Sequence, residues 1–182
     1  MGGADKALLR LAGQTLVARA VERLEPQVER LAISANGDAG RFGWLGLPVL
    51  PDDDPQGPLS GVLAGLDWAA PLGATAIVTV AVDCPFFPGD LVPHLALAAE
   101  GSAGGVALAR SGGDDHPTFG LWPVGLRGAL RAFLASGEKA RVRAFADAHA
   151  AARADFADDG AFGNLNTPED LARAEAMIGA GA

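Results

Sequence analysis

The chain has 182 residues, of which 49% are hydrophobic and 20% charged, and this composition is that of a globular protein rather than a disordered one. Its formal net charge of −8 argues against a nucleic-acid partner, because phosphate backbones are bound by clustered lysine and arginine, but it leaves single nucleotides open. One cysteine excludes an internal disulfide framework, and no apolar run approaches the roughly 20 residues that span a membrane, so we expect a cytoplasmic protein without a membrane partner.

The first part of the chain alternates helical and extended patterns. Apolar residues recur at helical spacing between Thr15, a candidate N-cap, and Pro26, which ends the helix. Short apolar stretches at 31–35 and 47–50 predict strands, and each is followed by turn residues. A further helix is predicted after Pro58.

The clearest strand is at 75–82, where both alternating faces are apolar or small, as is typical of a central parallel strand. Helical and extended patterns continue to alternate after it, which predicts one α/β domain over residues 1–182. We expect three layers, with a mostly parallel central sheet and helices on both faces. The later elements predicted are a helix at 88–99, strands at 105–109 and 117–123, helices at 125–135 and 139–148, a strand at 154–156, and a helix from Thr167.

Acidic residues follow two of the predicted strands. Asp83 comes directly after the strand at 75–82, and in open α/β sheets ligands bind beyond the carboxyl ends of the strands. A carboxylate there could hold a hard cation such as Mg²⁺, although it could also simply shape the turn before Pro85. Asp52 opens a run of three acids after the strand at 47–50, and such a run is also typical of a solvated turn.

The start of the chain places Gly2 and Gly3 shortly before Lys6. Glycines let backbone amides approach phosphate oxygens, and lysine adds a positive charge, but a glycine-rich start is also typical of a flexible terminus. The spacing is not that of a Walker loop. His116 opens a predicted strand, and a lone histidine in such a place is more often structural than catalytic.

Five motifs follow one another along the chain, and their order adds information that none carries alone. They are Met1-Gly2-Gly3-Ala4-Asp5-Lys6, Gly57-Pro58-Leu59-Ser60-Gly61, Val82-Asp83-Cys84-Pro85, His116-Pro117-Thr118 and Asn164-Leu165-Asn166-Thr167-Pro168-Glu169-Asp170. Together they resemble the signatures of the molybdenum cofactor guanylyltransferases over residues 1–174. The Thr-Pro-Glu-Asp segment marks the wider nucleotidyltransferase superfamily, whereas Gly-Pro-Leu-Ser-Gly with His-Pro-Thr narrows the resemblance to guanylyl transfer.

The resemblance implies a Rossmann-like nucleotidyltransferase fold and the transfer of GMP from GTP to the phosphate of molybdopterin, with release of pyrophosphate. It implies Mg²⁺ as cofactor and is compatible with transient contact with molybdoenzymes or cofactor-biosynthesis proteins. Lys6 and Asp83 are the implied catalytic residues, with Asp83 as metal ligand. The implied nucleotide-binding residues are Gly2, Gly3, Lys6, Ser34, Asn36, Asp52 and Asp83, and the implied molybdopterin-side residues are Asn164 and Asn166. Ser34, or the nearby Asn36, falls where the family has an asparagine beside the nucleotide, and a serine there is a departure.

One departure from the family pattern is large. The family signature begins with an apolar strand and a Leu-Ala-Gly-Gly turn, and this sequence starts after both. In a right-handed doubly wound sheet that first strand lies between the strands at 31–35 and 75–82, so we expect these two to share a sheet without pairing, roughly 9–10 Å apart. Two alternatives remain: a related nucleotidyltransferase that uses CTP or a sugar phosphate, and a nucleotide-binding protein without turnover.

Overall fold

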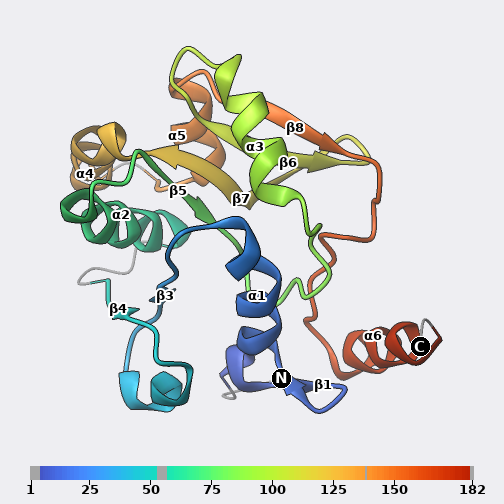
Figure 1. Cartoon of the computed structure of the whole chain (residues 1–182). Helices are drawn as coiled ribbons and strands as arrows, with labels where there is room; N and C mark the ends of the chain where they lie inside the picture. The colour runs from blue at the N-terminus through green and yellow to red at the C-terminus, as the bar shows by residue number, and fades with distance from the viewer. Residues whose placement is uncertain (1–4, 53–56, 138, 181–182) are drawn as a thin grey trace.

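The structure, a computed structural model, describes residues 5–52, 57–137 and 139–180 (Figure 1). Its described part is an α/β arrangement in which a four-stranded sheet lies between two sets of helices. No described helix has both the length and the apolar character needed to cross a membrane.

The four-stranded sheet has the order β5-β7-β6-β8. β7 pairs antiparallel with both of its neighbours, while β6 and β8 are parallel, so β5, β6 and β8 share one direction and β7 opposes them. This arrangement confirms the expected α/β class and adds one antiparallel strand to it. The strands span Ala76–Thr79 (β5), Ala107–Ser111 (β6), Asp114–Pro123 (β7) and Ala152–Phe156 (β8).

Helices cover both faces of this sheet, as expected, and each face has its own apolar core. One core contains buried side chains of α1 and α3 with residues of β6, β7 and β8. The other contains side chains of α2, α4 and α5 packed around Trp122, which is fully buried. These helices span Leu16–Leu24 (α1), Pro58–Ala69 (α2), Leu91–Glu100 (α3), Arg127–Ala135 (α4) and Val142–Ala148 (α5).

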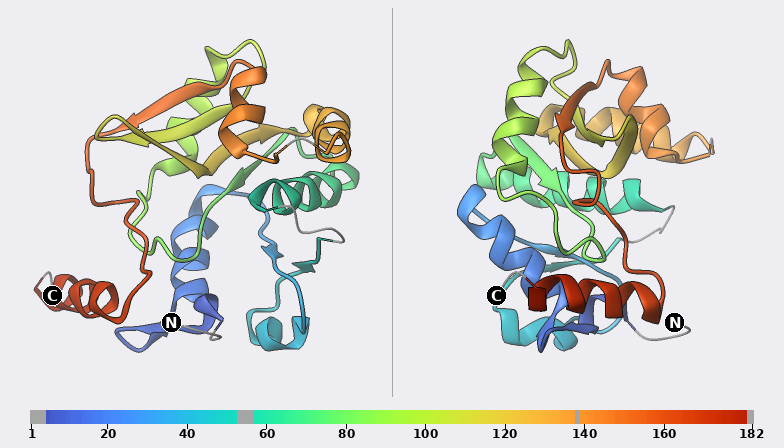
Figure 2. Two further views of the ribbon diagram at one scale, coloured as in Figure 1. Left: turned by 180° about the vertical axis from the view of Figure 1, so that it is seen from behind. Right: turned by 90° about the vertical axis from the view of Figure 1, so that its right-hand side faces the viewer.

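The last helix, α6 (Pro168–Ala180), lies apart from the four-stranded sheet and beside the start of the described chain (Figure 2). It packs with a two-stranded hairpin, β1 (Arg10–Leu11) and β2 (Gln14–Thr15), through a small core of its own. The sequence analysis missed this hairpin, because strands of two residues leave no alternating pattern. The predicted N-cap is confirmed, since the Thr15 hydroxyl accepts a hydrogen bond from the Ala18 amide at 3.3 Å.

β3 (Ile33–Ser34) and β4 (Val49–Leu50) pair with each other in parallel and form a ladder separate from the four-stranded sheet. Two expectations are therefore wrong. The segments 31–35 and 75–82 do not share a sheet, and β5 is an edge strand of its sheet rather than a central one. The expectation that these two segments do not pair with each other is confirmed among the described ladders.

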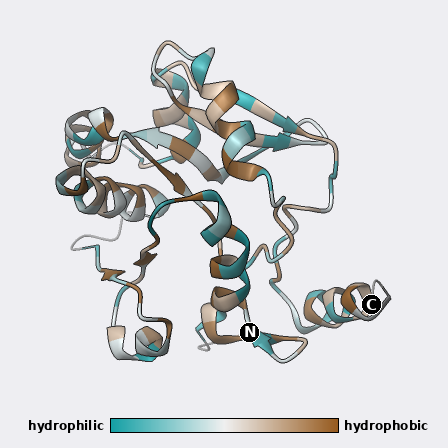
Figure 3. Ribbon diagram, viewed as in Figure 1, coloured by the Kyte–Doolittle hydropathy of each residue, from teal (hydrophilic) through white to brown (hydrophobic). Residues whose placement is uncertain are grey.

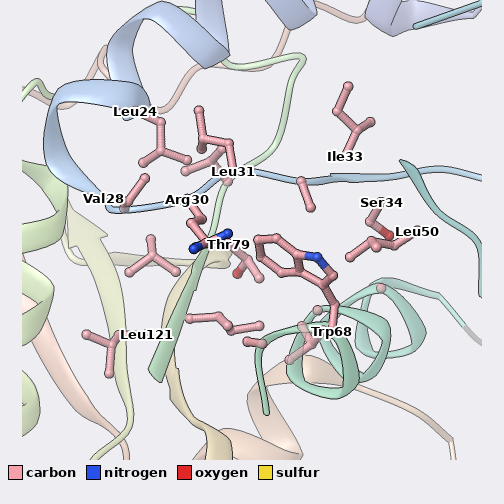
Figure 4. Close-up of a pocket in the computed structure, with 18 of the residues that line it drawn as sticks. Leu24, Val28, Arg30, Leu31, Ile33, Ser34, Leu50, Trp68, Thr79 and Leu121 are labelled. Carbon is pink, nitrogen blue, oxygen red and sulfur yellow. The ribbon is translucent and has the colours of Figure 1, made fainter. Parts of the chain in front are cut away.

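A cavity of about 700 Å³ explains these differences, because it lies between β3 and β5. Its walls include Leu24 of α1, Ile33 and Ser34 of β3, Trp68 of α2 and Thr79 of β5, whose side chains surround the open space in Figure 4. Both β3 and β5 are coloured as hydrophobic in Figure 3. The cavity separates the two ladders, so among the described strands β5 pairs with β7 alone, and every one of its residues is half-buried. We name this cavity the β3–β5 groove.

Candidate active site

Three of the predicted site residues converge on one ammonium group. The Lys6 Nζ lies 3.2 Å from the Asp83 Oδ2 and donates a hydrogen bond to the Asn166 Oδ1 at 2.6 Å. These residues come from the short 3-10 turn Lys6–Leu8, from the segment after β5, and from the loop before α6. The structure therefore brings together the start, middle and end of the chain at the predicted edge of the sheet.

Backbone contacts bring the third of these segments into place. The Leu165 amide donates a hydrogen bond to the Asp83 carbonyl oxygen at 2.8 Å, and the Leu165 side chain is buried. The residues on either side of it, Asn164 and Asn166, are exposed, and the side-chain oxygen of each accepts a hydrogen bond, from the Cys84 thiol and from the Lys6 ammonium respectively. This alternation places both predicted molybdopterin-side residues next to the carboxylate that follows β5.

Cys84 lies directly beneath this loop. Its thiol donates a hydrogen bond to the Asn164 Oδ1 at 2.8 Å, and the residue is 1% exposed. Burial, followed by the charge of Asp83, raises the pKa of the Cys84 thiol to about 12. A buried thiol that stays protonated is no nucleophile, so Cys84 is a packing residue.

The second group of predicted residues lies at the ends of β3 and β4. The Asp52 amide donates to the Asn36 Oδ1 at 2.9 Å, and the Asn36 Nδ2 donates to the Asp52 carboxylate. The Asn36 side chain thus binds both the backbone and the carboxylate of Asp52 and links the ends of two parallel strands. Gly2 and Gly3, as well as Asp53 and Asp54, lie outside the described residues.

Ser34 ends β3 and faces the motif that begins α2. A Cβ atom added at Gly61 would lie 2.7 Å from the Ser34 Oγ, closer than side chains tolerate. Gly61 is therefore the residue that lets α2 approach β3 at this point. Gly61, the last glycine of the Gly-Pro-Leu-Ser-Gly motif, therefore lies against Ser34.

The described residues contain no group of three or more histidine, cysteine or acidic side chains that could enclose a metal ion. Asp83 alone nevertheless fits a magnesium ion, because Mg²⁺ is commonly held by one or two carboxylates together with substrate phosphates and water. Its carboxylate is 18% exposed and already faces a cation, the Lys6 ammonium. The donor set therefore suits a metal that arrives with a phosphorylated substrate better than a fully enclosed one.

His116 lies away from these residues and contacts Ser111 and Phe162 instead. Its Nε2 lies 2.8 Å from the Ser111 Oγ, and its ring stacks on Phe162 at 4.4 Å between centroids. Burial lowers the pKa of His116, which favours the neutral ring. These contacts support the interpretation of His116 as a packing residue.

One charged residue next to the site was missed by the sequence analysis. Arg41 contacts both Asp5, the neighbour of Lys6, and the backbone of Asn36. It lies in a 3-10 segment, Ala39–Leu45, that has no hydrophobic periodicity and no motif, so no sequence signal indicated it.

We predict that Gly61→Ala destabilises the protein by about 1 kcal/mol, because the new methyl group overlaps the Ser34 Oγ and displacing it costs more than the helix propensity of alanine returns. The free energy of unfolding in urea measures this loss. Ser34→Ala removes the overlapping oxygen, so the double variant should recover most of the stability. A double variant as unstable as Gly61→Ala would contradict this contact. Gly43→Ala is a matched control, because a Cβ atom there meets nothing within 4 Å.

Comparison with known proteins agrees with this arrangement. The profile of the MobA-like NTP transferase domain matches residues 1–153. A molybdenum cofactor guanylyltransferase from Cereibacter sphaeroides is 62% identical over 178 residues, which cover 98% of this chain and 90% of that protein. Another, from Bradyrhizobium sp. (strain ORS 278), is 46% identical, with 97% of this chain and 86% of that protein covered.

Solved structures support the fold. The crystal structure of molybdopterin-guanine dinucleotide biosynthesis protein A from Archaeoglobus fulgidus has a TM-score of 0.75 at 20% identity, covering 98% of this chain and 92% of that one. That of 4-diphosphocytidyl-2C-methyl-D-erythritol synthase from Anaerococcus prevotii has a TM-score of 0.79 at 10% identity, covering 97% and 92%. At such identities the likeness shows the nucleotidyltransferase fold alone. Because of the curated relatives and the domain match, this chain belongs to the molybdenum cofactor guanylyltransferases, nucleotidyltransferase enzymes with a MobA-like NTP transferase domain.

Proposed function

We infer that this chain transfers GMP from GTP to the phosphate of molybdopterin and releases pyrophosphate. The observation that carries the inference is the convergence of Lys6, Asp83 and Asn166 at the edge of the sheet, in a chain 62% identical to a guanylyltransferase. A phosphate oxygen of molybdopterin forms the new bond to the α-phosphorus of GTP. The bond from that phosphorus to the β-phosphate oxygen breaks, and its electron pair leaves with pyrophosphate.

The acceptor needs little activation. A phosphate monoester is largely ionised near neutral pH, since its second pKa is about 6. The enzyme therefore needs no strong general base, which agrees with the packing role of His116. Catalysis depends instead on positioning two anions and offsetting their repulsion.

We propose that Lys6 and Asp83 perform this task together. Enzymes of this family generally use a divalent metal ion, and we propose that it is Mg²⁺ and that Asp83 holds it. When bound, the ion supplies positive charge to the phosphate oxygens. The Lys6 ammonium supplies a second positive charge, and its present partners, Asp83 and Asn166, hold it at the point where phosphate would enter.

The remaining residues divide between the two substrates in this proposal. Asn36, Asp52 and Ser34 contact the guanine nucleotide, and Gly2 and Gly3 supply backbone amides to its phosphates. Asn164 and Asn166 contact molybdopterin. The division is supported by their placement, since the first group follows β3 and β4 and the second lies on the loop fixed to Asp83.

We also propose that a strand from outside these 182 residues fills the β3–β5 groove. The groove is lined largely by apolar side chains, and it separates two ladders that would flank a single inserted strand. The Cereibacter relative supports this proposal, because this chain accounts for 90% of its length. A parallel strand there would pair with both β3 and β5 and join them in one sheet.

This strand proposal predicts an intact mass for the natively expressed protein well above 18.4 kDa. The 182-residue chain expressed alone should bind a hydrophobic dye such as ANS and melt at lower temperature, because its groove stays open. A native mass of 18.4 kDa, or equal dye binding and melting temperature in the two proteins, would reject the strand.

The proposed reaction predicts a strong preference for GTP over CTP when molybdopterin is the acceptor. Gly57-Pro58-Leu59-Ser60-Gly61 motivates this expectation, because the motif fixes α2 against Ser34 near the nucleotide side. Steady-state kcat/KM for each nucleotide, measured with the native polypeptide, gives the ratio. Comparable values would favour the cytidylyl-transferring relatives instead.

Asp83→Asn should lower magnesium-dependent guanylyl transfer by on the order of 10²-fold or more, because metal stabilisation of phosphoryl charge is worth several kcal/mol. The variant keeps the size of the side chain, so its melting temperature serves as the control for folding. Turnover like that of the wild type under limiting magnesium would remove Asp83 from the mechanism.

Lys6→Ala should weaken GTP binding about tenfold, because it removes one charge-assisted contact to phosphate. Asn166→Ala should chiefly raise KM for molybdopterin and weaken GTP binding clearly less than Lys6→Ala does, because Asp83 still contacts the Lys6 ammonium. Calorimetry with GTP and Mg²⁺ in the absence of molybdopterin measures the first effect, and steady-state kinetics measures the second. Equal losses of GTP affinity in both variants would refute the division between the two sides.

A further inference from the structure

Arg41 contacts Asp5, the neighbour of Lys6, and Asn36, a member of the second group of site residues. Its Nε donates to the Asp5 Oδ2 at 2.6 Å, and its Nη2 donates to the Asn36 carbonyl oxygen at 2.7 Å. Its Nη1 donates to the Asp38 carbonyl oxygen. The guanidinium therefore uses all three of its nitrogens on groups from two separate segments.

The first of these contacts leads to Lys6. Asp5 is the N-cap of the turn that carries Lys6, because its Oδ1 accepts a hydrogen bond from the Ala7 amide at 3.1 Å. Its other oxygen, Oδ2, is the one that Arg41 holds. Asp5 thus uses one carboxylate oxygen to shape the turn and the other to fix that turn to Arg41.

The second contact joins Arg41 to the pair formed by Asn36 and Asp52. Arg41 binds the backbone of Asn36, whose side chain pairs with Asp52. One planar guanidinium therefore spans from the turn of Lys6 to the pair formed by Asn36 and Asp52. Lysine could not reproduce this span, because its single ammonium lacks the rigid fork that contacts several partners at once.

The guanidinium is itself held in place. It lies 4.5 Å from the centroid of the Phe42 ring, a cation–π contact, and Phe42 is 1% exposed. Phe42 packs in the same core cluster as Ala7, the residue after Lys6. The side chain of Arg41 is 23% exposed, so its contacts are partly shielded from solvent.

We propose that Arg41 is a positioning residue for GTP, which fixes the turn of Lys6 relative to the pair of Asn36 and Asp52 and neutralises the charge of Asp5. This proposal rests on the assignment of Lys6, Asn36 and Asp52 to the GTP side. Fixing the turn and neutralising Asp5 should both strengthen GTP binding. A loose turn would misplace the Lys6 ammonium, and an unpaired Asp5 carboxylate beside it would repel the triphosphate.

The test uses Arg41→Ala, Arg41→Lys and Asp5→Asn in the native polypeptide, with GTP affinity by calorimetry and KM for both substrates. Arg41→Ala should weaken GTP binding about tenfold and leave KM for molybdopterin within about twofold. Arg41→Lys, which keeps the charge, should fall between wild type and Arg41→Ala. Combining Arg41→Ala with Asp5→Asn should cost less than the product of the single losses, because both remove the same contact.

Arg131→Ala is the matched control. Arg131 also pairs with a carboxylate, that of Asp67, at 2.8 Å, but it does so between α4 and α2 and should leave GTP affinity unchanged. Unchanged GTP affinity in Arg41→Ala, or equal rises in KM for both substrates, would overturn the proposal. If Lys6→Ala weakens GTP binding while Arg41→Ala does not, only the role of Arg41 fails. If neither variant changes GTP affinity, the assignment of the GTP side fails with it.

Discussion

The hydrogen bonds of the Lys6 ammonium join residues that are 77 and 160 positions away in the sequence, and the proposed site depends on this junction. The ion pair itself contributes little to stability, because the Lys6 side chain is 40% exposed and such pairs are worth about 0–1 kcal/mol. The geometry must therefore come from what lies beneath it. Ala7, Cys84 and Leu165, each next to one of the three polar residues, are all buried. The apolar neighbours fix the three segments, and the polar groups meet as a consequence.

Part of this arrangement could be predicted from local patterns. Thr15 caps its helix as expected, and Asp83 follows the carboxyl end of β5, the side of an α/β sheet on which ligands bind. The meeting of Lys6 with Asn166 could not be derived from periodicity, since it depends on how α6 and its preceding loop return to the start of the chain. Only the resemblance to a family indicated it. No sequence pattern indicated Arg41, because its contacts are tertiary and its segment has no repeating pattern of hydrophobic residues.

The largest error in the prediction concerns the strand at 75–82, and it has one physical cause. A strand with two apolar faces suggested a central position, but ladder pairing ends at Thr79 and involves β7 alone. Beyond Thr79, the segment 80–82 borders the β3–β5 groove. This segment therefore has the composition of a central strand but takes part in no ladder among the described residues. Asp83 follows it directly. A strand inserted in the groove would therefore order the segment that carries the proposed metal ligand.

The charges around the site explain how an acidic protein can bind two phosphorylated substrates. Lys6 and Arg41 are accompanied by three carboxylates, those of Asp5, Asp52 and Asp83, and the two cations are already paired with two of them. These five side chains together carry a net negative charge, which would repel a triphosphate. A divalent ion held by Asp83, as proposed above, would make the local charge positive, and Lys6 would then be able to face phosphate instead of its present partner. The metal would then be needed for GTP to bind as well as for the chemical step, because without it the cleft offers an anion more repulsion than attraction.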